Sequence, residues 1–206
     1  MPFPQSLTVR PLGLTAGGGA SGGGGPVASG TLSPPFTMQQ QQQTNWCWAG
    51  VSTSVGLFFT NGSWTQCAVA TSAIPNFPSP PAGPFDCCSN ASPCNIYGYL
   101  DVALQTTLSY GSMQSGTLGW GDLQGQITSN HVPVCLRIAW NGGGAHFVSI
   151  CGWSVDSSGN QYVDVGDPGT GAITTQQFNG SSAFPATYSV VGGTWTHTYF
   201  TQNQGL

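Results

Sequence analysis

The stretch TNWCWAGVSTSVGLFF, residues 44–59, decides how the central part of the chain folds. Its main apolar side chains recur at intervals of three, four and three residues, which is the period of an amphipathic helix. Thr44 or Asn45 is a suitable N-cap, and Asn61-Gly62 a suitable end. The pattern therefore predicts a helix with Cys47 in its first turn. The apolar face consists of Trp48, Val51, Val55 and Phe58.

Further helices are predicted only in the first two thirds of the sequence. Gly50 and Gly56 lie inside the first helix and each costs about 1 kcal/mol relative to Ala, so we expect them where another element packs closely. Asn95 is expected to open a second helix, with residues 100–108 supplying its apolar face. A short third helix is expected around residues 120–127.

After Pro133 the sequence changes to short segments rich in β-branched and aromatic residues, bounded by Gly, Pro or Asp. Helices first and strands afterwards predict an α+β fold. We expect an N-terminal helical lobe packed against an antiparallel β-sheet lobe, with a cleft between them. The expected strands are residues 134–140, 145–153, 161–165, 186–191 and 194–200.

Cys47 is the candidate nucleophile, because a helix N-terminus and a nearby imidazolium both stabilise a thiolate. The histidine must come from elsewhere in the chain. His146 begins a strand directly after the glycine run 142–144, where backbone and substrate can approach closely. His131 lies in an expected loop and His197 inside a Thr-rich strand, so we interpret both as ordinary surface or core residues.

An imidazole that acts as a base needs an acceptor that fixes its tautomer. Asp167 ends the strand after His146, and the following Pro168 stops that strand so that the carboxylate can project. Asp164 is the competing carboxylate, three residues earlier and within the strand. We favour Asp167.

Acyl transfer also needs hydrogen-bond donors for the developing oxyanion. The backbone N–H of Cys47 is one natural donor. The glutamine run at residues 39–43 offers five side-chain amides just upstream, although such a run is more often a polar linker.

Taken together, these motifs resemble the papain superfamily of cysteine peptidases. The residues that carry the resemblance are Gln41 six positions before Cys47, the segment TNWCWA, the segment WTQC at residues 64–67, Cys87-Cys88, Cys94-Asn95, the segment GAHFV around His146, and Asp167-Pro168. The likeness runs from about residue 39 to 201 and is closest to the compact bacterial branch related to the effector cysteine proteases of plant pathogens. Thr44 stands where the plant and lysosomal enzymes carry a cysteine, and Asp-Pro replaces the Asn-Ser-Trp of papain itself.

The resemblance implies a papain-like fold and an endopeptidase that cleaves polypeptides. Cys47 would attack the peptide carbonyl, His146 would protonate the leaving amine, Asp167 would orient His146, and Gln41 would donate to the oxyanion. It implies no cofactor and no metal. Two alternatives stay open: acyl transfer to an acceptor other than water on the same site, and a catalytically silent binding domain.

The seven cysteines predict an oxidising compartment, and hence a secreted or extracellular protein, although no signal peptide is visible in the sequence. The odd total suggests six paired cysteines and one free thiol. If Trp140 faces His146 across the turn, Cys135 faces Cys151 as well, and this pair is the first candidate for a disulfide; two unpaired core thiols are the alternative.

Charge is scarce, since the 206 residues include six Asp and only Arg10 and Arg137 as cations. Two arginines cannot displace the counterions of a nucleic acid, which excludes that partner. No run of about 18 apolar residues exists, so no membrane span is expected. Residues 1–36 are rich in Gly and Pro and are interpreted as a flexible linker or pro-segment before a peptidase domain at 37–206, which we expect to be a monomer.

Overall fold

The computed structural model describes residues 26–60 and 62–205. The helices are α1 (Cys47–Phe58), α2 (Gln66–Ala73), α3 (Leu100–Thr106), α4 (Trp120–Gln124) and α5 (Ala186–Ser189), with single turns η1 (Ile74–Asn76), η2 (Ser92–Cys94) and η3 (Gly125–Ser129). The strands are β1 (Ala28–Thr31), β2 (Tyr110–Ser115), β3 (Val134–Trp140), β4 (Ala145–Val155), β5 (Gln161–Asp167), β6 (Ala172–Gln177) and β7 (Gly193–Thr201).

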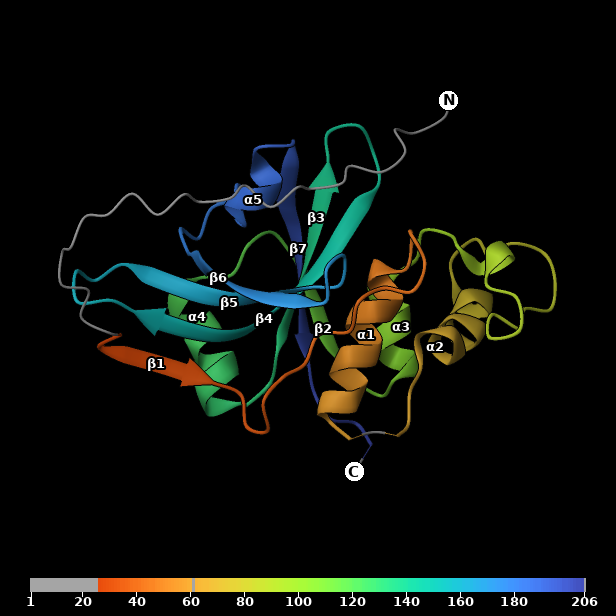
Figure 1. Ribbon diagram of the computed structural model, residues 1–206, viewed down its shortest axis with the longest axis horizontal. Helices are drawn as coiled ribbons and strands as arrows, with labels where there is room; N and C mark the ends of the chain where they lie inside the picture. Colours follow the sequence, from red (N-terminus) through yellow and green to blue (C-terminus); the bar gives the residue numbers. More distant parts are fainter. Residues whose placement is uncertain (1–25, 61, 206) are drawn as a thin grey trace.

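All strands of the described residues join one antiparallel sheet in the order β2-β7-β3-β4-β5-β6, and β1 pairs with the second half of β4. Helices α1, α2 and α3 gather beside this sheet, with α1 against β4 (Figure 1). The α+β class with an antiparallel sheet is therefore confirmed. Within the described residues, no helix is long and apolar enough to cross a membrane.

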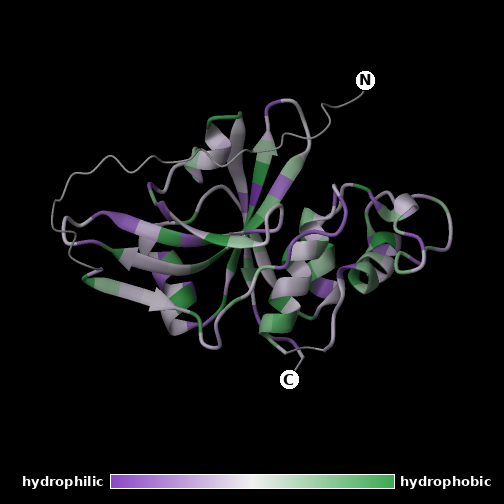
Figure 2. Ribbon diagram, viewed as in Figure 1, coloured by the Kyte–Doolittle hydropathy of each residue, from purple (hydrophilic) through white to green (hydrophobic). Residues whose placement is uncertain are grey.

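Helix α1 is the centre of the core. Its residues from Cys47 to Gly56 are all buried, and none of them is strongly hydrophilic (Figure 2). The two internal glycines confirm the expected close packing. A Cβ on Gly50 would lie 3.0 Å from Cβ of Pro168, and one on Gly56 would lie 2.9 Å from Cβ of Thr107. The absence of a side chain at Gly50 thus lets α1 approach the end of β5.

Several predicted boundaries are wrong. Helix α1 has Trp46 at its N-cap and no side-chain cap, so neither Thr44 nor Asn45 caps it, and it ends at Phe58 before the expected Asn61-Gly62. Helix α3 begins at Leu100, because Asn95 instead closes the turn η2. The expected strand at 186–191 is the short helix α5, which follows Pro185 and is closed by Gly192 with φ of +85°.

The expected linker also needs a correction over its last part. Residues 28–31 form β1, which pairs antiparallel with residues 152–155 of β4. The side chains of Leu32 and Phe36, which follow β1, are buried in the core. Residues from 28 to 36 therefore belong to the folded domain. Burial of two apolar side chains and pairing of one strand offset the conformational entropy that these residues lose on folding. Residues 1–25 of the expected linker lie outside the described residues.

The cysteine pairing differs from the prediction. Cys67 bonds to Cys88 and Cys87 to Cys94, whereas Cys135 and Cys151 are buried free thiols. The hairpin register is the reason, since Ile138 rather than Trp140 faces His146. This shift places Cys135 opposite Ser149, so that the expected disulfide cannot form. The two disulfides indicate an oxidising environment.

Candidate active site

The local structure around Cys47 holds its thiol at the N-terminus of α1. The two neighbouring indoles anchor the helix start to the end of η2 and the loop that follows it: Trp46 Nε1 donates to the carbonyl of Cys94 at 2.7 Å, and Trp48 Nε1 donates to that of Ile96 at 3.1 Å. Asn45 adds two hydrogen bonds to Asn95. Cys47 itself is only 7% exposed and opens into a pocket. The thiol therefore has a fixed position with access from one side.

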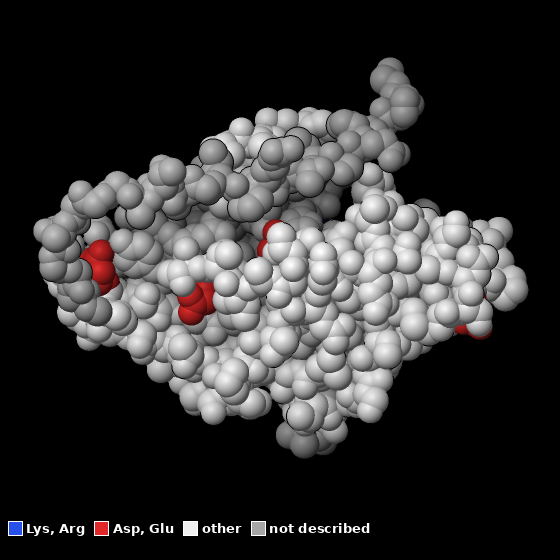
Figure 3. All heavy atoms as spheres, viewed as in Figure 1, with Lys and Arg blue, Asp and Glu red and all other residues white. Residues whose placement is uncertain are grey.

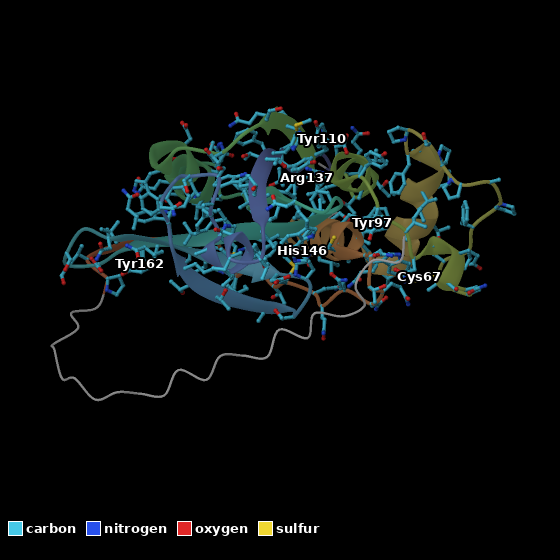
Figure 4. The ribbon with its side chains drawn as sticks, turned by 90° about the horizontal axis from the view of Figure 1, so that it is seen from above. Cys67, Tyr97, Tyr110, Arg137, His146 and Tyr162 are labelled. Carbon is cyan, nitrogen blue, oxygen red and sulfur yellow. A yellow bond between two sulfur atoms is a disulfide. The ribbon has the colours of Figure 1, made fainter. Side chains whose placement is uncertain are left out.

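His146 lies near the start of β4, directly after the turn formed by residues 141–144, and faces the beginning of α1 (Figure 4). Its Nε2 is 2.7 Å from Oδ1 of Asp167. Nδ1 is then the ring nitrogen left for the Cys47 thiol, which interacts with the imidazole. Burial alone would lower the pKa of His146, but the hydrogen bonds to Asp167 and Cys47 and the charges of both groups outweigh it, so the pKa is raised.

Asp167, the last residue of β5, is the carboxylate that contacts His146. Besides the imidazole it accepts hydrogen bonds from the hydroxyl of Tyr188 at 2.6 Å and from the backbone N–H of Gly169 at 2.7 Å. Desolvation opposes ionisation, yet the hydrogen bond and charge of His146, with these two donors, keep the pKa of Asp167 lowered. Asp164 points to another strand, where its Oδ1 accepts from Thr175 at 2.7 Å.

Two aromatic rings enclose the imidazole. Trp140 lies nearly parallel to His146, with ring centroids 6.4 Å apart and planes 20° apart. Tyr188 approaches from α5, with its ring centroid 5.5 Å from His146 and 6.0 Å from Trp140. Tyr188 was missed at the sequence level, because residues 186–191 were interpreted as a strand and nothing in the local sequence connects it to Asp167.

Gln41 lies in the loop that leads into α1. Its backbone N–H donates to the carbonyl of Pro168 at 2.7 Å, which brings the loop next to Asp167. Its Nε2 donates to the carbonyls of Gln43 at 2.9 Å and Thr44 at 2.8 Å. The side-chain amide of Gln41 therefore stabilises the turn before Cys47.

The buried side chain of Gln66 on α2 forms hydrogen bonds with the backbone of the glutamine run. It accepts from the backbone N–H of Gln42 and donates to the carbonyl of Gln40 at 2.8 Å. Sequence reasoning missed this residue, because it is 24 positions or more away along the chain and looks like any helix glutamine. The run is thus an ordered segment, and only Gln41 among its members bonds through its side chain to the turn before the nucleophile.

A pocket of about 240 Å³ opens beside Cys47. One wall comes from the loop between η2 and α3, and the other from strands β3, β4 and β7. The lining residues are Asn45, Cys47, Trp48, Tyr97, Gly98, Tyr99, Arg137, Gly144, Ala145, Phe147 and Tyr199.

The two other histidines lie apart from this site. His131 is exposed and has a φ of +54°. His197 sits on β7 and shares a 3.0 Å hydrogen bond with Thr196. Among residues 26–60 and 62–205, no group of three or more His, Cys, Asp or Glu side chains could hold a metal ion.

Neither the family models nor the curated proteins contain a match to this chain. The functional assignment consequently depends on the chemistry and the geometry of the site.

Proposed function

We propose that this protein is a papain-like cysteine endopeptidase with Cys47 as nucleophile, His146 as general acid and base, and Asp167 as the residue that orients His146. The observation that carries the proposal is the continuous chain of contacts from the thiol at the start of α1, through the imidazole on β4, to the carboxylate at the end of β5. Its order corresponds to nucleophile, base and orienting acid.

The reaction would begin with attack of the Cys47 thiolate on a peptide carbonyl. The raised pKa of His146 favours the imidazolium, which stabilises the thiolate and can then protonate the leaving amine. A covalent acyl-enzyme results, and the amine product leaves. His146, now neutral, accepts a proton from water as the water attacks the thioester, and release of the carboxylic acid restores the thiolate beside the imidazolium.

The oxyanion of each tetrahedral intermediate needs two donors. The N–H of Cys47, the first residue of the helix, has no partner within the helix and is available. We assign the second donor to Gln41, which would turn one of its two Nε2 hydrogens from the loop carbonyls toward the substrate.

The two disulfides further support activity in an oxidising compartment, and we propose that the protein acts outside the cytoplasm. A structural disulfide persists where the surroundings do not reduce it. The peptidase would then meet polypeptides in the same environment.

The test is hydrolysis of unfolded casein by the wild type and by matched pairs of variants. We expect Cys47→Ala and His146→Ala to abolish cleavage, while the controls Cys151→Ala and His197→Ala retain it. Asp167→Asn should reduce the rate, and Asp164→Asn should not. An epoxide that alkylates thiols should inactivate the wild type and add its mass to Cys47.

The outcomes separate the competing functions. If Cys47 is alkylated but neither casein nor a peptide library is cleaved, the interpretation changes from hydrolysis to acyl transfer to another acceptor. An added amine would then yield a new product. Cleavage that survives Cys47→Ala would refute the proposed nucleophile. A Cys47 that iodoacetamide leaves unmodified at neutral pH in the folded protein would point to a silent binding domain.

A further inference from the structure

The pocket beside Cys47 contains a cation, although cations are almost absent from this protein. The chain has two basic residues, Arg10 and Arg137, and Arg137 lines the pocket. In Figure 4, Arg137 on the sheet and Tyr97 on the opposite loop flank the region at the start of α1, near His146. On the face shown in Figure 3, the described residues display a few acidic groups and no basic ones. A lone arginine in a pocket next to a nucleophile therefore calls for an explanation.

The contacts of Arg137 fix its position without neutralising it. It sits on β3 between Phe147 of β4 and His197 of β7, and its Nη1 donates to the hydroxyl of Thr196 at 2.9 Å. Within the described residues, the one ion pair is that of His146 with Asp167, so no carboxylate pairs with Arg137. The guanidinium thus has a neutral hydrogen-bond partner, and it has further N–H groups that can donate to a ligand.

The surroundings of Arg137 limit how strongly water screens its positive charge. Arg137 is half-buried, and Phe147 and Tyr199, whose rings pack edge to face with centroids 6.0 Å apart, line the same pocket. The charge of Asp101 on α3 acts on Tyr199, which lines the pocket, but Asp101 itself does not line it. A charge in such a site attracts an anion more strongly than a surface lysine does, because water screens it less.

We propose that Arg137 makes this pocket a binding site for a carboxylate of the polypeptide substrate, supplied by an Asp or Glu side chain near the scissile bond or by the C-terminus of the substrate chain. This inference depends on the proposed peptidase function. The guanidinium forms charge-assisted hydrogen bonds to the carboxylate, while Tyr97 and Tyr99 cover the neighbouring part of the substrate chain.

The test uses internally quenched peptides that differ by Glu against Gln, or Asp against Asn, at each position around the cleaved bond. We expect the acidic peptide to have a kcat/KM roughly 10- to 100-fold higher at one position, as for a hydrogen bond to a charged group. Each peptide is prepared with a free and with an amidated C-terminus. If amidation of the C-terminus abolishes the preference, the bound carboxylate is the C-terminus of the substrate. If the preference is the same for free and amidated peptides, the bound carboxylate is the side chain.

Four variants make the result specific to Arg137. Arg137→Gln should lose the preference, Arg137→Lys should keep most of it, and Arg137→Glu should favour a basic residue at the same position. Arg10→Gln changes the net charge as Arg137→Gln does and should leave the preference intact. Thermal unfolding of each variant verifies that it is folded.

A second readout does not require peptide cleavage. Cys47 is alkylated with the iodoacetyl derivatives of glutamate and of glutamine, and the rates are followed by intact mass. A faster reaction of the glutamate reagent that Arg137→Gln removes supports the carboxylate site. Equal rates in the wild type, together with equal cleavage of acidic and neutral peptides, overturn it while leaving the peptidase intact. If Cys47 resists iodoacetamide as well, the proposed function itself fails and the inference with it.

Discussion

Tyr188→Phe removes one oxygen atom from the site and leaves the ring in place. The hydroxyl donates to Oδ2 of Asp167 at 2.6 Å, whereas the ring contacts to His146 and Trp140 involve only carbon atoms of Tyr188. A hydrogen bond to a charged group contributes about 1.5–3 kcal/mol. Because Asp167 keeps its bonds to His146 and Gly169, we take the low end, about 1.5 kcal/mol, which corresponds to a kcat/KM lower by slightly more than about tenfold.

The substitution should also change the pH profile. Desolvation raises the pKa of Asp167, and the hydrogen bonds and charge that outweigh it include the bond from Tyr188, so that the folded-state pKa is lowered. The stabilisation from an ionised Asp167 is present above its unfolded pKa and is lost as the pH falls through the folded pKa. Without the Tyr188 hydroxyl the folded pKa rises, so the acid limb of activity should move to higher pH.

The assay is the pH dependence of casein hydrolysis and of Cys47 alkylation by iodoacetamide, for wild type and variant. The matched control is Tyr162→Phe, which removes the same kind of bond, from Tyr162 to Asp156 at 3.1 Å, on a hairpin away from the site (Figure 4). The control should match the wild type. A Tyr188→Phe protein with unchanged kcat/KM and an unchanged acid limb would refute the positioning role of the hydroxyl.

Three further predictions concern the scaffold. Burial raises the pKa of Cys135 and Cys151 to about 12, so iodoacetamide at neutral pH should modify neither thiol before unfolding, as peptide mass mapping can verify; modification in the native state would contradict their burial. Replacing the Cys67–Cys88 disulfide, which closes a loop with a sequence separation of 21, by two serines should lower the free energy of unfolding by about 3 kcal/mol in urea titrations. A chain that begins at residue 37 loses β1 and two buried apolar side chains, and we expect it to be at least about 3 kcal/mol less stable than one that begins at residue 26; equal stability would restore the linker interpretation.

Local patterns predicted much of the secondary structure. The three-four spacing around Trp48 located α1, and the β-branched segments located β3 exactly over its span and most of β4, β5 and β7. These signals succeed because periodicity and side-chain shape act within a few residues. They missed β1, β2 and β6, whose small or polar residues gain their order from pairing with strands far along the chain.

For the candidate site, the sequence by itself determined the chemical groups: a cysteine at a helix start, a histidine after a glycine turn and an aspartate before a proline. Only the tertiary structure decided which of them meet. The hairpin register placed Cys135 opposite Ser149, the packing of α1 at Gly50 against Pro168 brought Asp167 to the helix, and α5 delivered Tyr188 to the carboxylate. The reason is physical, because residue type and local spacing set what a segment can do, whereas contacts between distant segments depend on how whole surfaces fit together.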